Sequence, residues 1–214
     1  RSGSSTGGSS GAVSITRLLR ATKEQEVAGV EFLGGIPGTI GGAVRMNAGT
    51  VMGEVSDSLE SARIVYGDGT AAWVPASELG LSYRRSELPP GSIVTGARFH
   101  TTDADLSMRE RLAEVLAYRK STQPLQMPSC GSVFANPDGD HAGRLIEACG
   151  LKGRRIGGAQ VAEMHANWIV NLGDATASDV RALIELCVSE VEAQHGVRLR
   201  HEVKMLGDWP EGGQ

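Results

Sequence analysis

Ser132 is the residue whose surroundings most favour chemistry on a substrate. It lies in the stretch Pro128–Phe134, which reads PSCGSVF. No Gly-x-Ser-x-Gly elbow surrounds it, which disfavours a hydrolase nucleophile. A hydroxyl in an apolar, extended segment could instead hand a proton to a substrate carbon. The alternative, which the local sequence alone favours, is a serine bonded to neighbouring backbone. Cys130, two residues earlier, is interpreted as a buried and inert thiol.

Two charged residues are further candidates. Arg84 follows Tyr83 in the run YRRS, and its planar guanidinium suits a carboxylate or a phosphate. The alternative is an ordinary surface arginine. Glu202 is flanked by Arg200 and Lys204, and cations on the same strand face would keep its carboxylate ionised. The alternative there is a solvated strand face with modest ion pairing.

The segment from Gly34 to Gly49 is unusually rich in glycine and reads GGIPGTIGGAVRMNAG. Glycines allow backbone N–H groups to approach a phosphate or a flat ring without obstruction by a Cβ. The spacing matches neither a Walker loop nor G-x-G-x-x-G. The alternative is tight packing of a buried turn. The segment is too rich in glycine for a stable helix, so we expect a loop.

Composition excludes several classes of protein. The 214 residues have a formal net charge of −4, which disfavours binding to nucleic acid through a diffuse positive surface. No apolar run reaches the roughly 18 residues that a membrane helix needs. The three cysteines lack C-x-x-C spacing, and His141 has no partner at ligand spacing, so we expect no metal. These features predict a cytoplasmic protein with no membrane partner.

The elements needed to position these residues follow from local patterns. Residues 1–12 are mostly Ser and Gly and are expected to form a flexible or engineered end. Periodicity and turn signals predict helices over 15–20, 141–148 and 178–194, and a helix that opens at 107. They predict strands over 59–66, 70–74, 92–100, 167–172 and 197–206. The fold class is therefore α+β, with a boundary between 104 and 105.

Six segments, in this order, resemble the MurB family of flavin-dependent UDP-N-acetylenolpyruvoylglucosamine reductases. They are GIPGTIGGAVRMNAG (35–49), SYR (82–84), PSCGSVFANP (128–137), AGRLIEACGLKG (142–153), HANWIVN (165–171) and HEV (201–203). The resemblance spans nearly everything from Val13 to Trp209. It implies a partial FAD-binding domain of the MurB/VAO type over 13–104, followed by a substrate-binding α+β domain over 105–214.

The family resemblance implies roles for particular residues. Ser132 matches the general acid that protonates C2 of the enolpyruvyl group, and Arg84 and Glu202 match residues that polarise the substrate carboxylate. The segment expected to contact the flavin comprises Gly35, Ile36, Pro37, Gly38, Thr39, Gly41, Gly42, Asn47, Ala48 and Gly49. Substrate contacts are expected at Tyr83, Arg119, Asn136, Gln160 and His165. The implied cofactors are FAD and NADPH, and the implied substrate is UDP-N-acetylglucosamine enolpyruvate, a precursor in peptidoglycan synthesis.

Two departures from the family pattern qualify this expectation. The stretch between Arg119 and Pro128 has no room for a long substrate-covering loop, which is typical of the shorter, type II form. Nothing here matches the family's Gly-Ser-Asn loop for the FAD pyrophosphate, so we expect a chain that lacks the N-terminal FAD-binding subdomain. Two hypotheses remain, which are a working reductase and a flavin-free fragment that only binds the UDP-sugar.

Overall fold

The computed structural model describes residues 5–103 and 106–209 and divides into two compact units. We call Arg1–Tyr118 the N-terminal unit and Arg119–Gln214 the C-terminal unit. The domain boundary expected from the sequence lies earlier, between 104 and 105. The difference is helix α4 (Leu106–Thr122), most of which belongs to the N-terminal unit. The Leu112 side chain of α4 lies directly against the backbone of Gly34, so this helix packs on the N-terminal unit. The boundary expected from the sequence coincides with the start of α4 and not with the start of the second unit.

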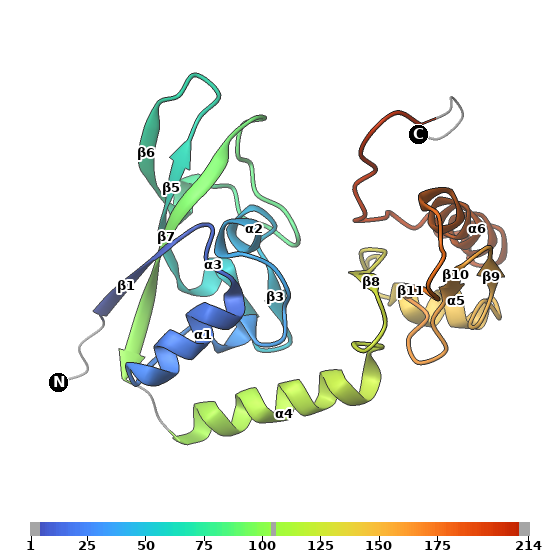
Figure 1. Ribbon diagram of the computed structural model, residues 1–214, viewed down its shortest axis with the longest axis horizontal. Helices are drawn as coiled ribbons and strands as arrows, with labels where there is room; N and C mark the ends of the chain where they lie inside the picture. Colours follow the sequence, from blue (N-terminus) through green and yellow to red (C-terminus); the bar gives the residue numbers. More distant parts are fainter. Residues whose placement is uncertain (1–4, 104–105, 210–214) are drawn as a thin grey trace. The chain divides into compact units, whose positions relative to one another are not determined.

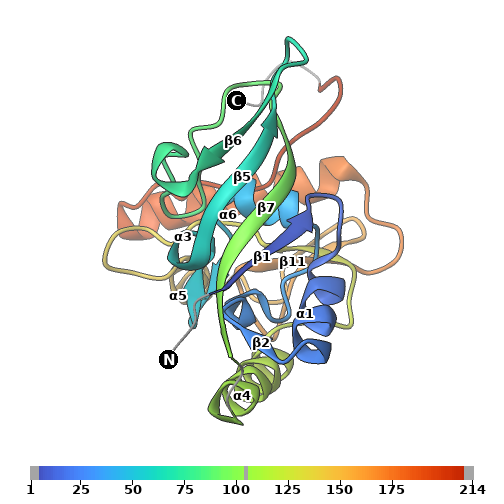
Figure 2. The same cartoon turned by 90° about the vertical axis from the view of Figure 1, so that its left-hand side faces the viewer.

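An antiparallel sheet forms the framework of the N-terminal unit. Its strands are β1 (Ser5–Ser10), β7 (Ile93–Asp103), β5 (Leu59–Val65) and β6 (Ala71–Pro75), in that order, as Figure 2 shows. The short strand β2 (Val27–Ala28) pairs with the far end of β7. The β5–β6 hairpin turns through Gly69, whose φ is +85°. The strands predicted over 59–66 and 70–74 are therefore confirmed to within one residue, and they form a hairpin.

The first strand contradicts the expectation of a flexible end. Residues 5–10 pair in register with residues 96–101 of β7 (Figure 1). Strand pairing uses backbone N–H and C=O groups, so a Ser/Gly segment can complete the edge of β7 without apolar side chains. Few apolar side chains in residues 5–10 correctly indicate little side-chain packing. Composition cannot show that the edge of β7 is available to pair with their backbone.

Helices, 3-10 turns and two short strands lie beside the sheet, and several of them contain the Gly-rich segment. They are α1 (Ile15–Glu24), the 3-10 turn η1 (Glu31–Leu33), α2 (Ile40–Arg45), β3 (Gly49–Thr50), β4 (Gly53–Glu54), α3 (Val55–Ser58) and the 3-10 turn η2 (Ala76–Glu78). The expectation of a loop throughout 34–49 is wrong, because 40–45 is helical. Ile40 and Val44 are fully buried and Thr39 caps the helix, so packing offsets the poor helix propensity of glycine.

The C-terminal unit is a smaller sheet covered by two helices. Strands β8 (Ser129–Ser132), β11 (Trp168–Asn171), β10 (Ala159–Val161) and β9 (Arg155–Ile156) lie in that order, all antiparallel. Helices α5 (Ala142–Ala148) and α6 (Ala177–His195) pack with them around a buried apolar cluster. Helix α6 begins at a Thr176–Asp179 capping box and ends at Gly196, whose φ is +69°. The predicted positions of both helices are confirmed.

The predicted strand over 197–206 is wrong. Only His201 forms a bridge, an isolated one to Phe134 outside the strands, and the rest of the segment is irregular. The alternation of inward and outward residues also breaks at this point, because His201 is exposed and Glu202 is half-buried. A period-2 pattern predicts sides correctly only while the backbone stays regularly pleated.

Candidate functional site

The exposed surface of the Gly-rich segment lies just before helix α2. Gly35, Pro37, Gly38 and Thr39 are exposed, and Ile36 is half-buried. Within the described residues, the backbone N–H groups of Gly35, Gly38 and Thr39 have no protein acceptor. A Cβ built at Gly38 would meet nothing within 4 Å. The segment therefore presents free backbone donors over open space, which suits acceptor atoms of a flat ring or an anion.

Two other glycines of the segment serve packing instead. A Cβ at Gly41 would lie 2.8 Å from the Val94 carbonyl oxygen, and one at Gly49 would lie 2.5 Å from the Gly53 carbonyl oxygen. Both neighbours are backbone and cannot yield as a flexible side chain would. Gly42 is exposed, and a Cβ there would meet only the Thr39 hydroxyl, at 3.6 Å. Gly38 and Gly42 therefore fit the interpretation as a ligand-binding surface, and Gly41 and Gly49 fit the interpretation as tight packing.

Arg84 lies at the tip of a tight turn that reaches the end of the Gly-rich segment. Ser82 and Arg85 exchange two backbone hydrogen bonds of 3.0 Å, which leaves Tyr83 and Arg84 as the two turn residues. The Arg84 guanidinium donates to the carbonyl oxygen of Gly49 (2.9 Å) and lies 5.0 Å from the centre of the Tyr83 ring. Tyr83 itself is 50% exposed. Two motifs separated by about 35 residues are thereby joined.

Asn47, predicted to contact a cofactor, is fully buried and bonded within the protein. Its Nδ2 donates to Glu54 Oε1 (2.8 Å) and to the Ser82 carbonyl oxygen (3.1 Å). Its Oδ1 accepts from the Ser56 amide at 2.9 Å. The side chain has no remaining donor for a ligand. Ala48 and Gly49 are half-buried beside it.

Ser132 and Glu202 are neighbours in the C-terminal unit. The Glu202 amide donates to the carbonyl oxygen of Val133, the residue directly after Ser132, at 2.8 Å. Ser132 is exposed at the end of β8, and its hydroxyl has no partner in the described part of the chain. The expected bond to local backbone is therefore absent. Cys130 is exposed, contrary to the expectation of a buried residue, and desolvation raises the pKa of its thiol.

One carboxylate oxygen of Glu202 is buried and has no hydrogen-bond partner among the described residues. The expected pairing with Arg200 and Lys204 is absent, since no ion pair joins Glu202 to either residue within 5–103 and 106–209. The inward position of Glu202 removes its side chain from the exposed face that Arg200 and Lys204 share. A buried, unpartnered carboxylate oxygen is rare and points to a missing ligand or proton.

Asn167 is a positioning residue that the sequence analysis did not identify. It is 4% exposed, and its side-chain amide both accepts from the Phe134 N–H (2.9 Å) and donates to the Phe134 carbonyl oxygen (2.8 Å). Its own carbonyl oxygen accepts from the Val133 amide. The amide thus extends strand pairing beyond Ser132. The only sequence signal was its place in the segment HANWIVN.

His165 and Gln160, two predicted substrate contacts, are both hydrogen-bonded within the C-terminal unit. The Asn167 N–H donates to Nδ1 of His165 (3.2 Å), so the neutral ring carries its proton on Nε2. Burial, aided by the charge of Lys152, lowers the pKa of His165. Gln160 is buried and donates to the Gly153 carbonyl oxygen at 3.1 Å. Lys152 in turn pairs with Glu147 at 2.7 Å.

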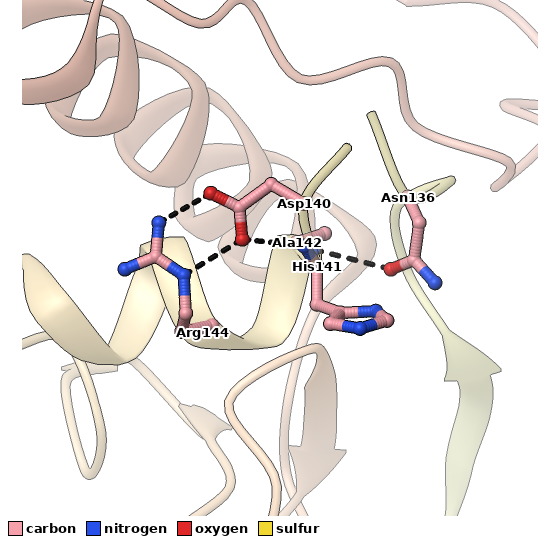
Figure 3. A network of polar contacts seen from close by, with 5 residues as sticks. All are labelled: Asn136, Asp140, His141, Ala142 and Arg144. Carbon is pink, nitrogen blue, oxygen red and sulfur yellow. Dashed lines mark hydrogen bonds and ion pairs between the residues drawn. The ribbon is translucent and has the colours of Figure 1, made fainter. Parts of the chain in front are cut away.

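Asn136 caps helix α5 from outside the helix. Figure 3 shows its side-chain oxygen facing the Ala142 amide, at 3.1 Å, and Asp140 turned toward Arg144. Asp140 has a residue type that favours an N-cap, but the N-cap position of α5 is His141. Asp140 instead forms a two-bond ion pair with Arg144, which holds the pKa of that carboxyl well below its usual value. The Asn136 amide nitrogen remains available.

The last predicted site residue, Arg119, lies in the final turn of α4 and is half-buried, which lowers the pKa of its guanidinium. The described residues include no group of three or more His, Cys, Asp or Glu side chains able to hold a metal ion. No described helix is both long and apolar enough to cross a membrane.

Comparisons with known proteins agree with this division into units. Residues 123–206 match the family model described as UDP-N-acetylenolpyruvoylglucosamine reductase, C-terminal domain, and residues 9–74 match a model described as FAD binding domain. The chain is 50% identical over 196 residues to the UDP-N-acetylenolpyruvoylglucosamine reductase of Myxococcus xanthus, covering 91% of this chain and 63% of the relative. The enzyme of the same name from Anaeromyxobacter dehalogenans is 47% identical and is covered to 60%.

A solved structure gives the same result. The crystal structure of MurB from Thermus caldophilus matches with a TM-score of 0.84 at 40% identity, covering 92% of this chain and 71% of that one. The chain spans about 60% of the length of the curated relatives it matches. From the identity, the coverage and the two family models, the chain belongs to the UDP-N-acetylenolpyruvoylglucosamine reductase (MurB) family.

Proposed function

We propose that this chain acts in the NADPH-dependent, FAD-mediated reduction of UDP-N-acetylglucosamine enolpyruvate to UDP-N-acetylmuramate. The observation that carries the proposal is that Glu202 is bonded to Val133, the residue directly after Ser132. A free hydroxyl and a buried, unpartnered carboxylate oxygen adjoin one backbone segment. No other polar pair in the described residues combines a free donor with an orphaned carboxylate in this way.

The two groups can complete the reduction of a carbon–carbon double bond. A bound flavin would supply a hydride to C3 of the enolpyruvyl group. Negative charge then builds up at C2 and on the adjoining carboxylate. The Ser132 hydroxyl would give its proton to C2 and regain one from water, and Glu202 would help as a carboxyl group that donates a hydrogen bond to the substrate carboxylate on which that charge develops. Positioned groups of this kind stabilise the transition state more than the ground state.

Arg84 supports the same step through the substrate carboxylate. Its guanidinium keeps donors beyond the one that Gly49 accepts, and a fork of donors matches a carboxylate. Tyr83, exposed beside it, offers a ring and a hydroxyl to the substrate. We assign both to substrate binding, with Arg84 as the electrostatic partner of the developing charge.

The Gly-rich segment fits a flavin on the evidence of its exposed donors. Among the residues that the structure describes, the N–H groups of Gly35, Gly38 and Thr39 have no acceptor, and no side chain lies over Gly38. We assign the flavin contacts to the exposed stretch from Gly35 to Thr39 with Gly42, and we assign Gly41 and Gly49 to packing. Three side chains of the C-terminal unit, those of Asn136, Gln160 and His165, together with Arg119, complete the proposed substrate contacts.

An absorption spectrum before and after incubation with excess FAD tests the cofactor assignment. The proposal expects a bound-flavin spectrum that survives gel filtration and is bleached by NADPH. A colourless protein that still binds the UDP-sugar would instead support the alternative, a flavin-free binding fragment. That alternative is favoured by one observation, which is that Ser132, Glu202, Gln160 and His165 all belong to the C-terminal unit.

Substitution of Ser132 separates the two half-reactions, which are reduction of the flavin by NADPH and reduction of the substrate. In flavin-loaded protein, Ser132→Ala is expected to leave NADPH-driven flavin reduction intact and to lower product formation by about a hundredfold or more. Ser129→Ala, on the same strand, is the matched control and should leave both steps unchanged. Glu202→Gln is expected to lower turnover more than substrate affinity. Equal loss of both half-reactions in Ser132→Ala would overturn the proton-donor role.

A further inference from the structure

We propose that Asn47 is a positioning residue for Arg84 and holds that arginine ready for the substrate carboxylate, rather than contacting the flavin. The inference rests on the proposed function, because the role of Arg84 does. It reassigns a residue that the family motif placed among the cofactor contacts. The Asn47 amide bonds to Ser82, at the base of the turn that carries Arg84.

The Asn47 side chain is fully committed. Both hydrogens of its amide nitrogen are used, by Glu54 Oε1 and by the Ser82 carbonyl oxygen, and its oxygen accepts from the Ser56 amide. The residue is 0% exposed and adopts a φ of +41°, a conformation that asparagine tolerates better than most side chains. A flavin could not gain a hydrogen bond from this amide without breaking one of the three.

The bond to Ser82 sets the position of Arg84. Ser82 closes the two-residue turn, so fixing its carbonyl oxygen fixes the base of the turn. Arg84 itself has a φ of +55°, which is unfavourable for an arginine and persists only where surrounding bonds impose it. Its guanidinium donates back to Gly49, two residues beyond Asn47, with a longer contact of 3.5 Å to the Asn47 carbonyl oxygen. The Asn47 side chain therefore holds the turn that carries Arg84, and the Arg84 side chain holds the backbone that follows Asn47.

A second pair of bonds holds the far side of the same loop independently. The Ser86 hydroxyl donates to the Arg45 carbonyl oxygen at 2.6 Å, and the Arg45 guanidinium donates to the Leu88 carbonyl oxygen at 3.0 Å. These bonds do not involve Asn47. Loss of the Asn47 amide should therefore release the Ser82–Arg85 turn while the rest of the loop stays attached.

Asn47→Asp is the sharpest perturbation. Aspartate has the same shape and tolerates the same φ, but it donates no hydrogen bond and would place a carboxylate against Glu54 and the Ser82 carbonyl oxygen. Asn171→Asp is the matched control, because the Asn171 oxygen only accepts, from Gly173 and Ala175, and aspartate can do the same. Asn47→Gly serves as a second variant if Asn47→Asp fails to fold, because glycine adopts the same φ and removes the amide without adding a charge.

The first measurement needs neither substrate nor flavin. Hydrogen exchange by mass spectrometry should show the segment 82–85 exchanging about tenfold faster in Asn47→Asp, and trypsin should cut faster after Arg84. The segment 86–88 and the C-terminal unit should keep their protection, as should the whole of Asn171→Asp. Unchanged exchange at 82–85, in Asn47→Asp or in a folded Asn47→Gly, would overturn the proposal.

The second measurement is a double-mutant cycle on affinity for UDP-N-acetylglucosamine enolpyruvate, read by calorimetry. Asn47→Asp should weaken binding about tenfold in the parent and less than about twofold in Arg84→Ala, because its effect passes through Arg84. Additive losses would refute that dependence, as would weakened FAD affinity with unchanged substrate affinity. If the parent binds no substrate, the proposed function fails, and the exchange result still decides whether Asn47 holds the turn.

Discussion

Replacing Asn167 by leucine should destabilise the C-terminal unit more than any other single change to its polar groups. Leucine has the same number of side-chain heavy atoms and the same branching as asparagine, so the change leaves little cavity. It removes the two hydrogen bonds between the side-chain amide and Phe134 and keeps the backbone bonds of residue 167. The N–H and carbonyl oxygen of Phe134, which is 2% exposed, would then be buried without partners.

The size of the effect follows from those two orphaned groups. A buried polar group that loses its partner costs about 1 to 3 kcal/mol, so two cost about 2 to 6 kcal/mol. Burying the leucine side chain offsets about 1 kcal/mol of this. We therefore expect the free energy of unfolding to fall by about 1 to 5 kcal/mol, which is a large part of the stability of a small domain.

Urea unfolding followed by hydrogen exchange at the amides of Val133 and Phe134 measures the loss within this unit alone. Asn171→Leu is the control, since Asn171 bonds two turn amides that water can reach, and it should cost about 1 kcal/mol or less. A loss below about 1 kcal/mol for Asn167→Leu, or equal losses for both variants, would refute the reasoning. Full stability with faster exchange confined to Phe134 would mean that water replaces the amide.

Two further predictions concern packing and pH. Gly41→Ala should lower the free energy of unfolding of the N-terminal unit by about 1 to 3 kcal/mol, because the new Cβ meets the Val94 carbonyl oxygen at 2.8 Å, whereas Gly42→Ala should not destabilise it. Burial raises the pKa of Cys187 to about 12, above its unfolded value near 9.0. The folded state therefore holds this proton more tightly, and stability present below pH 9 should fall as pH rises toward 12, by up to about 1.4 kcal/mol per pH unit. Urea midpoints at pH 8 and pH 10.5 measure this fall, and an equal fall in Cys187→Ala would contradict its assignment to the thiol.

Local pattern was sufficient for the elements whose signals lie within a few residues. Helix α6 follows from its apolar stripe, and its left-handed end follows from Gly196. The β5–β6 hairpin follows from the Gly-Asp-Gly turn between two apolar runs. The ordered motifs were also sufficient for the family, because their residue types and order are preserved along the chain.

Tertiary structure alone decided which groups meet. Composition described residues 5–10 as flexible, yet the open edge of β7 gives them partners about 90 residues away. Alternation placed Glu202 outward, yet its bond to Val133 lies where the regular strand ends and turns the carboxylate inward. Asn47 and Asn167 look like ordinary polar residues in the sequence. Their roles arise because a buried amide must find partners wherever the fold brings backbone groups within reach, and sequence neighbours do not encode that distance.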